Sequence, residues 1–455
     1  MKYLAIDIGA SSGKMLEARL EKGKIITKIV HRFENRLIQQ NGHLCWDIRY
    51  LEDEILEGLK KAKDADYVSI DTWAVDYVLL DKDDRLLSPA VSYRDSRTEN
   101  ISLPLSREDL YKRTGIQFQR FNTIYQLAAQ KEEDPSVLDK ASSLLFIPDY
   151  LAFRLTGEKV QEYTNATTTD MVKAGTKEWD SDLVGKLGFP SDLFGKISMP
   201  GTILGPLRKE VREMTGCNAT FILAPTHDTA CAVLASPLRE DSLFLSSGTW
   251  SLLGCINEDA ITSDAAMKSN FTNEGADNGM IRFLKNIMGT WMLQNIRKES
   301  GENLSFDEIV MKASKSRLIG LVDALSPRFL SPSSMSGEID RALEEQGLGK
   351  PSGIGERALV VYHSLANAYK NAIEEISTIT GRKFSHLAIV GGGSRDDFLN
   401  RLTRKYTGLA VTAGPDEGSA AGCLLSAMIH TGEIRREDIP SLLSSSFDIK
   451  TIQED

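Results

Sequence analysis

Two short turns rich in Gly, Ser and Thr have the composition of phosphate-binding loops. Residues 9–14 read Gly-Ala-Ser-Ser-Gly-Lys between apolar runs, and residues 246–249 read Ser-Ser-Gly-Thr in the same setting. Such turns expose successive backbone N–H donors, and the hydroxyls add more. The first turn is not a P-loop, because three residues separate its glycines and Met15 follows the Lys. A third candidate, residues 391–393, is Gly-Gly-Gly. An ordinary tight hairpin explains one such turn, but three favour a nucleotide.

Asp7 stands at the end of the apolar run that leads into the first turn. A carboxylate in that position repels phosphate unless a cation lies between them. Mg²⁺ takes one or two carboxylates together with phosphate oxygens, so it resolves the conflict. The alternative is a solvated turn residue without a ligand.

A polar trio, His227, Asp228 and Thr229, opens the apolar segment that ends at Ala235. The pattern predicts a buried helix whose first turn carries these side chains. A carboxylate there is kept ionised by the helix dipole and can accept the proton of a substrate hydroxyl. A plain helix cap explains Asp228 equally well.

Charged groups and one indole crowd the segments 71–76 and 94–97. Carboxylates and guanidiniums bind sugar hydroxyls, and an indole face packs on sugar C–H groups. A surface salt-bridge cluster accounts for the charges as well. Asn286, in an apolar stretch, offers an amide donor and acceptor, or a local cap. The charged and aromatic residues of the two segments are Asp71, Trp73, Asp76, Arg94, Asp95 and Arg97.

These residues need an α/β framework to position them. The patterns predict hairpins at 3–16 and 243–254, and strands at 67–70, 77–80 and 386–390. They predict helices at 356–380, 395–403 and 417–430. The two hairpins lie half a chain apart, which indicates a duplicated domain. We place the boundary near Ser236 and expect domains 1–236 and 237–455 with a cleft between them.

Composition narrows the class of protein. The chain has 455 residues, a formal net charge of −10 and a sequence pI of about 5.4, which disfavours nucleic acid and anionic membrane as partners. No run of about 18 apolar residues occurs, so we expect a cytoplasmic protein. The five Cys and six His residues lack zinc-type or i, i+4 spacing, which predicts reduced core thiols and no transition-metal site.

Several longer stretches resemble the FGGY carbohydrate kinases, and among them most closely the rhamnulokinase branch. They are DIGASSGK (7–14), DTWAVDYVLLD (71–81), EYTNATTTDMV (162–172), HDTACAVLASPL (227–238), LSSGTWSLLG (245–254), LKNIMGTWMLQ (284–294) and VGGGSRDDFLN (390–400). The resemblance runs from the first strand to about Gly422. It implies two ribonuclease-H-like α/β domains of the actin, sugar-kinase and heat-shock-chaperone ATPase superfamily, with the catalytic cleft between them.

The same resemblance implies roles for individual residues, with ATP and Mg²⁺ as cofactors. Asp228 would be the proton acceptor, and Asp7 would serve the metal. The sugar would meet Ala74, His227, Asp228, Thr229 and Asn286, and the charged and aromatic segment described above adds Trp73 and Asp76. The nucleotide would meet Ala10, Ser11, Ser12, Gly13, Lys14, Thr249, Gln294 and Gly392. The expected reaction converts ATP and L-rhamnulose to ADP and L-rhamnulose 1-phosphate, in a monomer or small homo-oligomer.

Two positions depart from the rhamnulokinase pattern. Ala74 stands where that branch commonly has Gly, and residues 415–419 read PDEGS in place of PxEAS. Because position 74 belongs to the presumed sugar site, L-fuculose, L-ribulose or another ketose is an alternative substrate. An actin-like nucleotide sensor without sugar kinase activity is the alternative from another class.

Overall fold

The computed structural model describes residues 1–330 and 332–453, which form two compact units. Unit 1 comprises Met1–Ala235, Ile256–Phe283 and Gly418–Ser446. Unit 2 comprises Ser236–Cys255, Leu284–Glu417 and the described residues from Phe447 onward. The chain thus first passes from unit 1 to unit 2 at residue 236, and two later segments return to unit 1.

The sheet of unit 1 has the strand order β11-β12-β6-β1-β2-β3. Its strands are β1 (Lys2–Ile8), β2 (Ser12–Glu21), β3 (Lys24–Glu34), β6 (Tyr67–Thr72), β11 (Ile203–Pro206) and β12 (Thr220–Ile222). β1 runs antiparallel to β2 and parallel to β6, which places Asp7 in register with both Lys14 and Asp71. Residues 3–8 of β1 are all buried, as expected for a central strand covered on both faces.

The second sheet, ordered β15-β16-β14-β13-β17-β18-β19, repeats this arrangement. β13 runs antiparallel to β14 and parallel to β17, just as β1 does to β2 and β6. Its strands are β13 (Ser242–Ser247), β14 (Trp250–Asn257), β15 (Thr272–Gly275), β16 (Ile281–Met288), β17 (His386–Val390), β18 (Ala410–Ala413) and β19 (Lys450–Thr451). Both predicted hairpins and the α/β class are confirmed.

The remaining strands of the described residues form three short pairs. They are β4 (Leu37–Gln40) with β5 (His43–Trp46), β7 (Tyr77–Leu80) with β8 (Ser143–Phe146), and β9 (Gln161–Glu162) with β10 (Ile197–Ser198). The predicted strand 77–80 is therefore present, but it pairs with β8 and does not join the sheet of β6.

The helices of unit 1 pack on its sheet and on a second hydrophobic cluster around β7, β8 and α3. In α1, Leu51, Ile55 and Leu59 recur every four residues and bury one face, and Asp47 caps its first turn. The helices are α1 (Ile48–Lys61), α2 (Arg107–Thr114), α3 (Thr123–Glu133), α4 (Pro135–Lys140), α5 (Ile147–Thr156), α6 (Tyr163–Ala166), α7 (Ser181–Leu187), α8 (Lys209–Thr215), α9 (Asp228–Leu234), α10 (Asp264–Lys268), α16 (Gly418–His430) and α17 (Ile439–Ser446).

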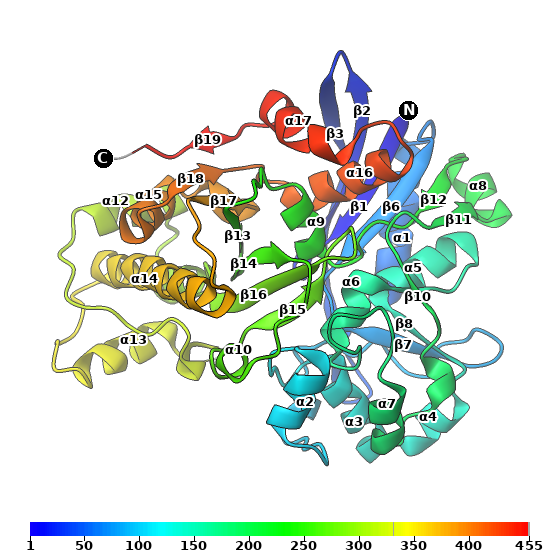
Figure 1. The fold of residues 1–455 in the computed structure, drawn as a ribbon, viewed down its shortest axis with the longest axis horizontal. Coiled ribbons are helices and arrows are strands. Elements are labelled where there is room, and N and C mark those ends of the chain that lie inside the picture. Colours follow the sequence, from blue (N-terminus) through cyan, green and yellow to red (C-terminus); the bar gives the residue numbers. More distant parts are fainter. Residues whose placement is uncertain (331, 454–455) are drawn as a thin grey trace. The chain divides into compact units, whose positions relative to one another are not determined.

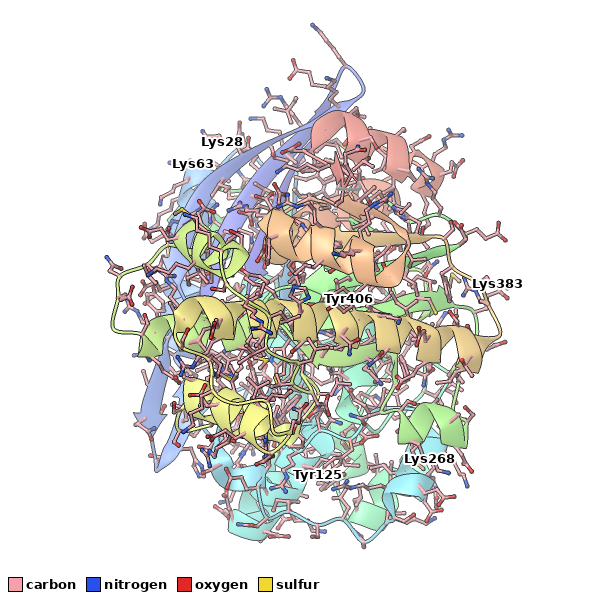
Figure 2. All side chains as sticks on the ribbon, turned by 90° about the vertical axis from the view of Figure 1, so that its left-hand side faces the viewer. Lys28, Lys63, Tyr125, Lys268, Lys383 and Tyr406 are labelled. Atoms are coloured by element: carbon pink, nitrogen blue, oxygen red, sulfur yellow. The ribbon has the colours of Figure 1, made fainter. Side chains whose placement is uncertain are left out.

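Unit 2 is dominated by the long helix α14 (Ile354–Thr380), with α15 (Asp397–Thr407), which carries Tyr406, alongside it (Figure 2). Its other helices are α11 (Trp291–Glu299), α12 (Phe306–Ser314) and α13 (Met335–Glu344). The predicted helix 395–403 begins later, because residues 392–395 form a 3₁₀ turn and Asp396 caps α15 by accepting from Leu399 N at 3.0 Å. No helix in the described part of the chain is long and apolar enough to cross a membrane.

α9 and α16 lie against each other and against the sheet of unit 1 (Figure 1). The two helices approach each other closely at Gly422, where an added Cβ would lie 1.8 Å from the carbonyl oxygen of Cys231. A backbone atom cannot rotate away as a side chain can, so this crossing requires glycine.

We expect Gly422→Ala to lower the free energy of unfolding by about 1–3 kcal/mol, because the extra methyl overpacks the crossing. Gly185 in α7 is the matched control, since an added Cβ there meets nothing within 4 Å. Gly185→Ala should be neutral or stabilise by up to about 1 kcal/mol through helix propensity. Urea unfolding followed by circular dichroism measures both, and equal effects would contradict the close crossing.

Candidate functional site

Carboxylates gather at the carboxyl ends of the parallel strands of unit 1. Asp7 is the penultimate residue of β1 with 4% of its surface exposed, and its Oδ2 lies 3.0 Å from Lys14 Nζ on the neighbouring strand. Asp71 lies beside it on β6 and is fully buried. Asp7 is therefore not a solvated turn residue, and the surface-cluster explanation does not apply to Asp71.

Asp228 is the first residue of α9, and His227 is the N-cap. Its Oδ1 accepts hydrogen bonds from Thr229 N at 2.6 Å and Thr229 Oγ1 at 3.2 Å. Burial, together with the nearby negative charge of Asp7, raises the pKa of Asp228 to about 7. A carboxylate with that pKa can take up a proton near neutral pH, as a general base must.

The tip of the first hairpin is held by its own backbone and by Asn35. Gly9 N donates to Ser12 O at 2.9 Å, and Asn35 Nδ2 donates to Gly9 O at 3.0 Å. Ser11 and Ser12 are exposed and Ala10 is half-buried, so these residues are accessible to a ligand. Gly13 is different: an added Cβ would lie 2.2 Å from the ring of Phe33, so its small size has a packing reason.

The corresponding turns of unit 2 form a second group. At the tip of the β13–β14 hairpin, Gly248 O accepts from Thr290 N at 3.0 Å, and Thr249 O accepts from Trp291 N at 3.3 Å. Gln294, one turn later in α11, donates from Nε2 to Thr290 Oγ1 at 3.0 Å. The predicted residues Thr249 and Gln294 therefore lie near one another.

The glycine-rich turn after β17 lies against the end of β13. An added Cβ at Gly393 would lie 2.0 Å from Ser247 Oγ, whereas one at Gly392 would meet nothing within 4 Å. Gly391 has a φ of 88°, in the left-handed region that favours glycine. Asn286, also in unit 2, is half-buried on β16.

The bend between β6 and β7 contains Trp73, Ala74 and Asp76. Asp76 is buried, and its Oδ2 accepts from Trp46 Nε1 at 2.6 Å, Trp73 Nε1 at 2.9 Å and Tyr93 N at 3.1 Å. Gln126 Nε2 donates to its other oxygen at 2.8 Å. Asp76 is thus an anchor for the Trp73 indole of the bend and for the Trp46 indole of β5.

Backbone strain marks the same bend. Val75 has a φ of 68°, which is rare for a β-branched residue, and Thr123 Oγ1 fixes its carbonyl by donating at 2.6 Å. Strained residues of this kind persist where the surroundings hold them, and they concentrate at functional sites. The half-buried Ala74 precedes Val75 directly.

Sequence reasoning missed the partners of His227. Arg282 and Glu274, from β16 and β15, are buried with it, and Arg282 Nη2 lies 3.1 Å from His227 Nδ1. The available signal was a charged residue inside the apolar run of residues 281–284, because a charge in a buried strand needs partners.

A buried cluster of Asp71, Cys231 and Cys423 also escaped the spacing rules, since its members come from three elements. Their donor atoms all lie within 4.8 Å of one another. Burial raises the pKa of the Cys231 thiol well above its usual range, and that thiol donates to Pro225 O at 3.1 Å. Metals bind the thiolate, so this environment favours a neutral Cys231 thiol; burial also raises the pKa of Asp71, which favours the neutral carboxyl.

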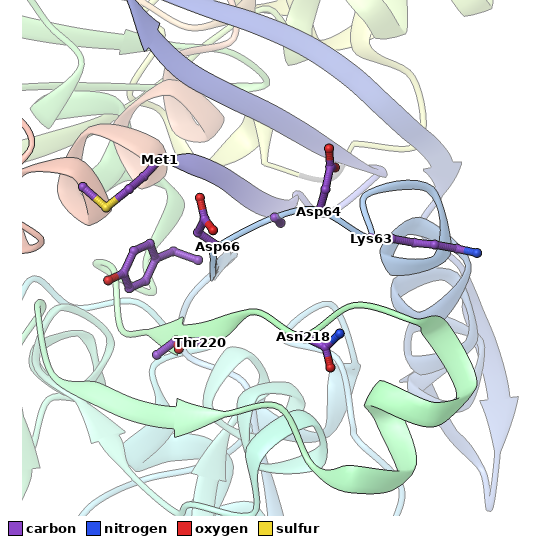
Figure 3. Close-up of a pocket in the computed structure, with 8 residues that line it drawn as sticks. Met1, Lys63, Asp64, Asp66, Asn218 and Thr220 are labelled. Carbon is purple, nitrogen blue, oxygen red and sulfur yellow. The ribbon is translucent and has the colours of Figure 1, made fainter.

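An open pocket of about 500 Å³ lies at the other end of the strands (Figure 3). It lies where β1, β6 and β12 begin, and Met1, Tyr67 and Thr220 are among its lining residues. Ligands of open α/β sheets bind outside the carboxyl ends of the strands, which is where Asp7, Asp71 and Asp228 gather. The pocket is therefore not the candidate site.

Family models match almost the whole chain. The N-terminal domain of the FGGY family of carbohydrate kinases matches residues 2–235, and the C-terminal domain of that family matches residues 243–431. The chain belongs to the FGGY family of carbohydrate kinases. A carbohydrate kinase of this family takes a sugar and ATP as substrates.

Curated relatives and solved structures agree with this assignment. The chain is 45% identical to a rhamnulokinase of Oceanobacillus iheyensis, over 98% of this chain and 97% of the relative. It is 46% identical to a rhamnulokinase of Halalkalibacterium halodurans, over 99% of this chain and 98% of the relative. The fold resembles that of xylulose kinase from Lactobacillus acidophilus, with a TM-score of 0.81 and 16% identity over 100% of this chain and 93% of that chain. It also resembles glycerol kinase of Plasmodium falciparum, with a TM-score of 0.77 and 16% identity over 100% of this chain and 94% of that chain. The two-domain α/β sugar-kinase fold is thus confirmed.

The anchoring role of Asp76 predicts that Asp76→Asn lowers the free energy of unfolding by about 1–3 kcal/mol. An amide can replace only one carboxylate oxygen as acceptor, so its NH₂ group would face one of the donors. Asp81→Asn is the control, because Asp83 N and Arg85 N both donate to one oxygen of Asp81, in an exposed turn. Urea unfolding and tryptophan fluorescence measure the effect, and two equally stable variants would contradict the anchor.

Proposed function

We propose that this carbohydrate kinase phosphorylates L-rhamnulose at the expense of ATP, giving L-rhamnulose 1-phosphate and ADP. The observation that carries the proposal is the placement of Asp228: a carboxylate of pKa about 7 at the start of α9, directly after the buried His227. The names of the relatives, identical at 45–46% of positions over nearly the whole chain, supply the sugar.

In this proposal Asp228 accepts the proton of the sugar hydroxyl. Thr229 fixes Oδ1, so we assign Oδ2 to the substrate proton. The transition state of phosphoryl transfer is loose and needs only modest base assistance, so a weakly basic carboxylate is sufficient. His227, Thr229 and Asn286 would hold other hydroxyls, with Ala74 and the Trp73 indole against the C–H surface. Asp76 would act on the sugar through Trp73.

The nucleotide is assigned to the two groups of turns. Residues 10–14 would donate to phosphate from the domain 1–236, and Thr249, Gln294 and Gly392 would serve ATP from the domain 237–455. The exposed serines of the first tip and the open surroundings of Gly392 support this assignment. Exclusion of water from the bound nucleotide would prevent hydrolysis of ATP.

The donor set near Asp7 fits a magnesium ion. Asp7 and Asp228 place carboxylates at the carboxyl ends of the parallel strands, and the charges of both help to raise the pKa of the buried Asp71. Oxygen ligands of this kind suit Mg²⁺, and Asp7, next to the first turn, is the residue we assign to hold it. The ion would neutralise charge on the transferred phosphoryl group.

The substrate is tested by a panel of L-rhamnulose, L-fuculose, L-ribulose and D-xylulose with ATP and Mg²⁺, assayed by ADP release. We expect the highest kcat/KM with L-rhamnulose and little ADP release without sugar. A higher kcat/KM with another ketose would show that this ketose, and not L-rhamnulose, is the preferred substrate. A rate of ADP release that is the same with and without each of the four sugars would instead support a nucleotide sensor.

Asp228→Asn should lower kcat by about 10²- to 10⁴-fold with little change in ATP affinity, because it removes the base and keeps the shape. In the wild type, kcat/KM should rise with pH up to about 7 and then level off, since only ionised Asp228 accepts the proton.

Stability provides the control for this variant. Folding raises the pKa of Asp228, so its contribution to stability falls as pH rises from about 4, the usual value, to about 7. The Asn variant should therefore be at least as stable as the wild type at pH 8. A variant that melts normally and retains most of its turnover would refute the assignment of the base.

A further inference from the structure

Arg282 is a fully buried arginine in the middle of unit 1, next to the residue that precedes the proposed base. Its Nε donates to Gly275 O at 2.8 Å, and its Nη2 lies 3.1 Å from His227 Nδ1 and 3.2 Å from Glu274 Oε2. A buried ion pair rarely stabilises a fold relative to apolar residues of similar size. Its presence here calls for a reason other than stability.

The contact with His227 fixes which ring nitrogen carries the proton. A guanidinium has only N–H donors, so Nδ1 must accept from Arg282 through its lone pair. In a neutral imidazole the proton then belongs to Nε2. His227 Nε2 lies 3.5 Å from Asp228 Oδ1, so the N–H group is on the side of the carboxylate.

We propose that Arg282 is a positioning residue that holds His227 as the neutral Nε2–H tautomer. The ring then presents a neutral N–H group to Asp228, in place of a lone pair or a cationic imidazolium. A lone pair at Nε2 would repel the carboxylate. A cationic imidazolium would pair with the carboxylate and weaken it as a base. The consequence for turnover rests on the proposed role of Asp228, whereas the tautomer itself does not.

Electrostatics around the ring agree with this geometry. Burial and the positive charge of Arg282 lower the pKa of His227 well below its usual range, so the ring stays neutral. Glu274 compensates the charge of Arg282. The charged and titratable groups that face this network are Asp7 on β1, Asp71 on β6, Tyr93, Glu162, Glu274 on β15, Arg282 on β16, and Asp228 and Cys231 on α9.

Glu274 also defines the competing arrangement. Its Oε2 lies 3.5 Å from His227 Nδ1, so an Nδ1–H tautomer would donate to Glu274 if Arg282 were absent. Removing the arginine should therefore move the proton from Nε2 to Nδ1.

Long-range ¹H–¹⁵N correlation spectra of the histidine rings distinguish the two tautomers. In the wild type without ligands, His227, assigned by comparison with His227→Gln, should show the neutral Nε2–H pattern down to pH 5.5. In Arg282→Met the pattern should change to Nδ1–H or to the cation. An Nδ1–H or charged ring in the wild type would overturn the proposal, and so would an unchanged tautomer in a folded variant.

A second variant removes the risk that an unpaired Glu274 prevents folding. Arg282→Met with Glu274→Gln eliminates both charges, and it should lose the Nε2–H pattern too, whereas Glu274→Gln alone should keep it. Arg113→Met breaks a partly buried ion pair with Asp180 in the same unit and serves as the control. It should leave the tautomer of His227 unchanged.

Kinetics then separate this inference from the proposed function. With the best ketose of the panel, Arg282→Met should lower kcat by about tenfold to a hundredfold, with KM for ATP unchanged, and should alter the pH dependence of kcat/KM. Arg113→Met should change neither kcat nor the pH dependence of kcat/KM. A tautomer switch without a change in kcat would refute the link to the base, whereas failure of every ketose would refute the proposed function and leave the tautomer result intact.

Discussion

Repulsion among like charges is the constraint on which the site depends. The topology of unit 1 brings the buried Asp7 and Asp71 and the half-buried Asp228 together at the carboxyl ends of β1 and β6. Ionised carboxylates in low dielectric repel each other strongly, and burial disfavours the charged form of each. The three carboxylates differ in how this repulsion is relieved. Asp7 pairs with Lys14, and Asp71 is driven toward its neutral form. Asp228 titrates near neutral pH.

Polar groups on neighbouring elements hold the segment that carries Asp228, whereas neither oxygen of Asp71 has a hydrogen-bond partner among the residues that the structure describes. Thr229 donates to Asp228 and holds its carboxylate. Glu162 accepts from the hydroxyls of Thr226 and Thr164. The hydroxyl of Thr164 in turn accepts from the backbone N–H of His227. Buried polar groups that are hydrogen-bonded in this way keep their positions. The segment before α9 is therefore fixed by buried hydrogen bonds that no substrate has to provide.

Local patterns were sufficient to predict much of this fold. The alternation of apolar residues and small-residue turns located both hairpins, and helical spacing located α14 and α16, because these signals lie within one element. Asp228 could be predicted since its neighbours in sequence define a helix start. Arg282, Glu274 and the Asp71, Cys231 and Cys423 cluster could not be predicted, because contact between β15, β16, α9 and α16 follows from tertiary packing. The late start of α15 depended on which of two consecutive aspartates, Asp396 or Asp397, forms the cap.

The crossing of α9 and α16 has a consequence for how the chain is made. Unit 1 draws its segments from three separate parts of the sequence, and the backbone contact at Gly422 joins the helix of Asp228 to the last of them. During synthesis, the ribosome releases α9 long before α16 exists. The apolar face of α9 must therefore wait, unburied by its partner, until nearly all of unit 2 has emerged. Assembly of the site is thus one of the last events in the biogenesis of this protein, and a truncated nascent chain lacks it.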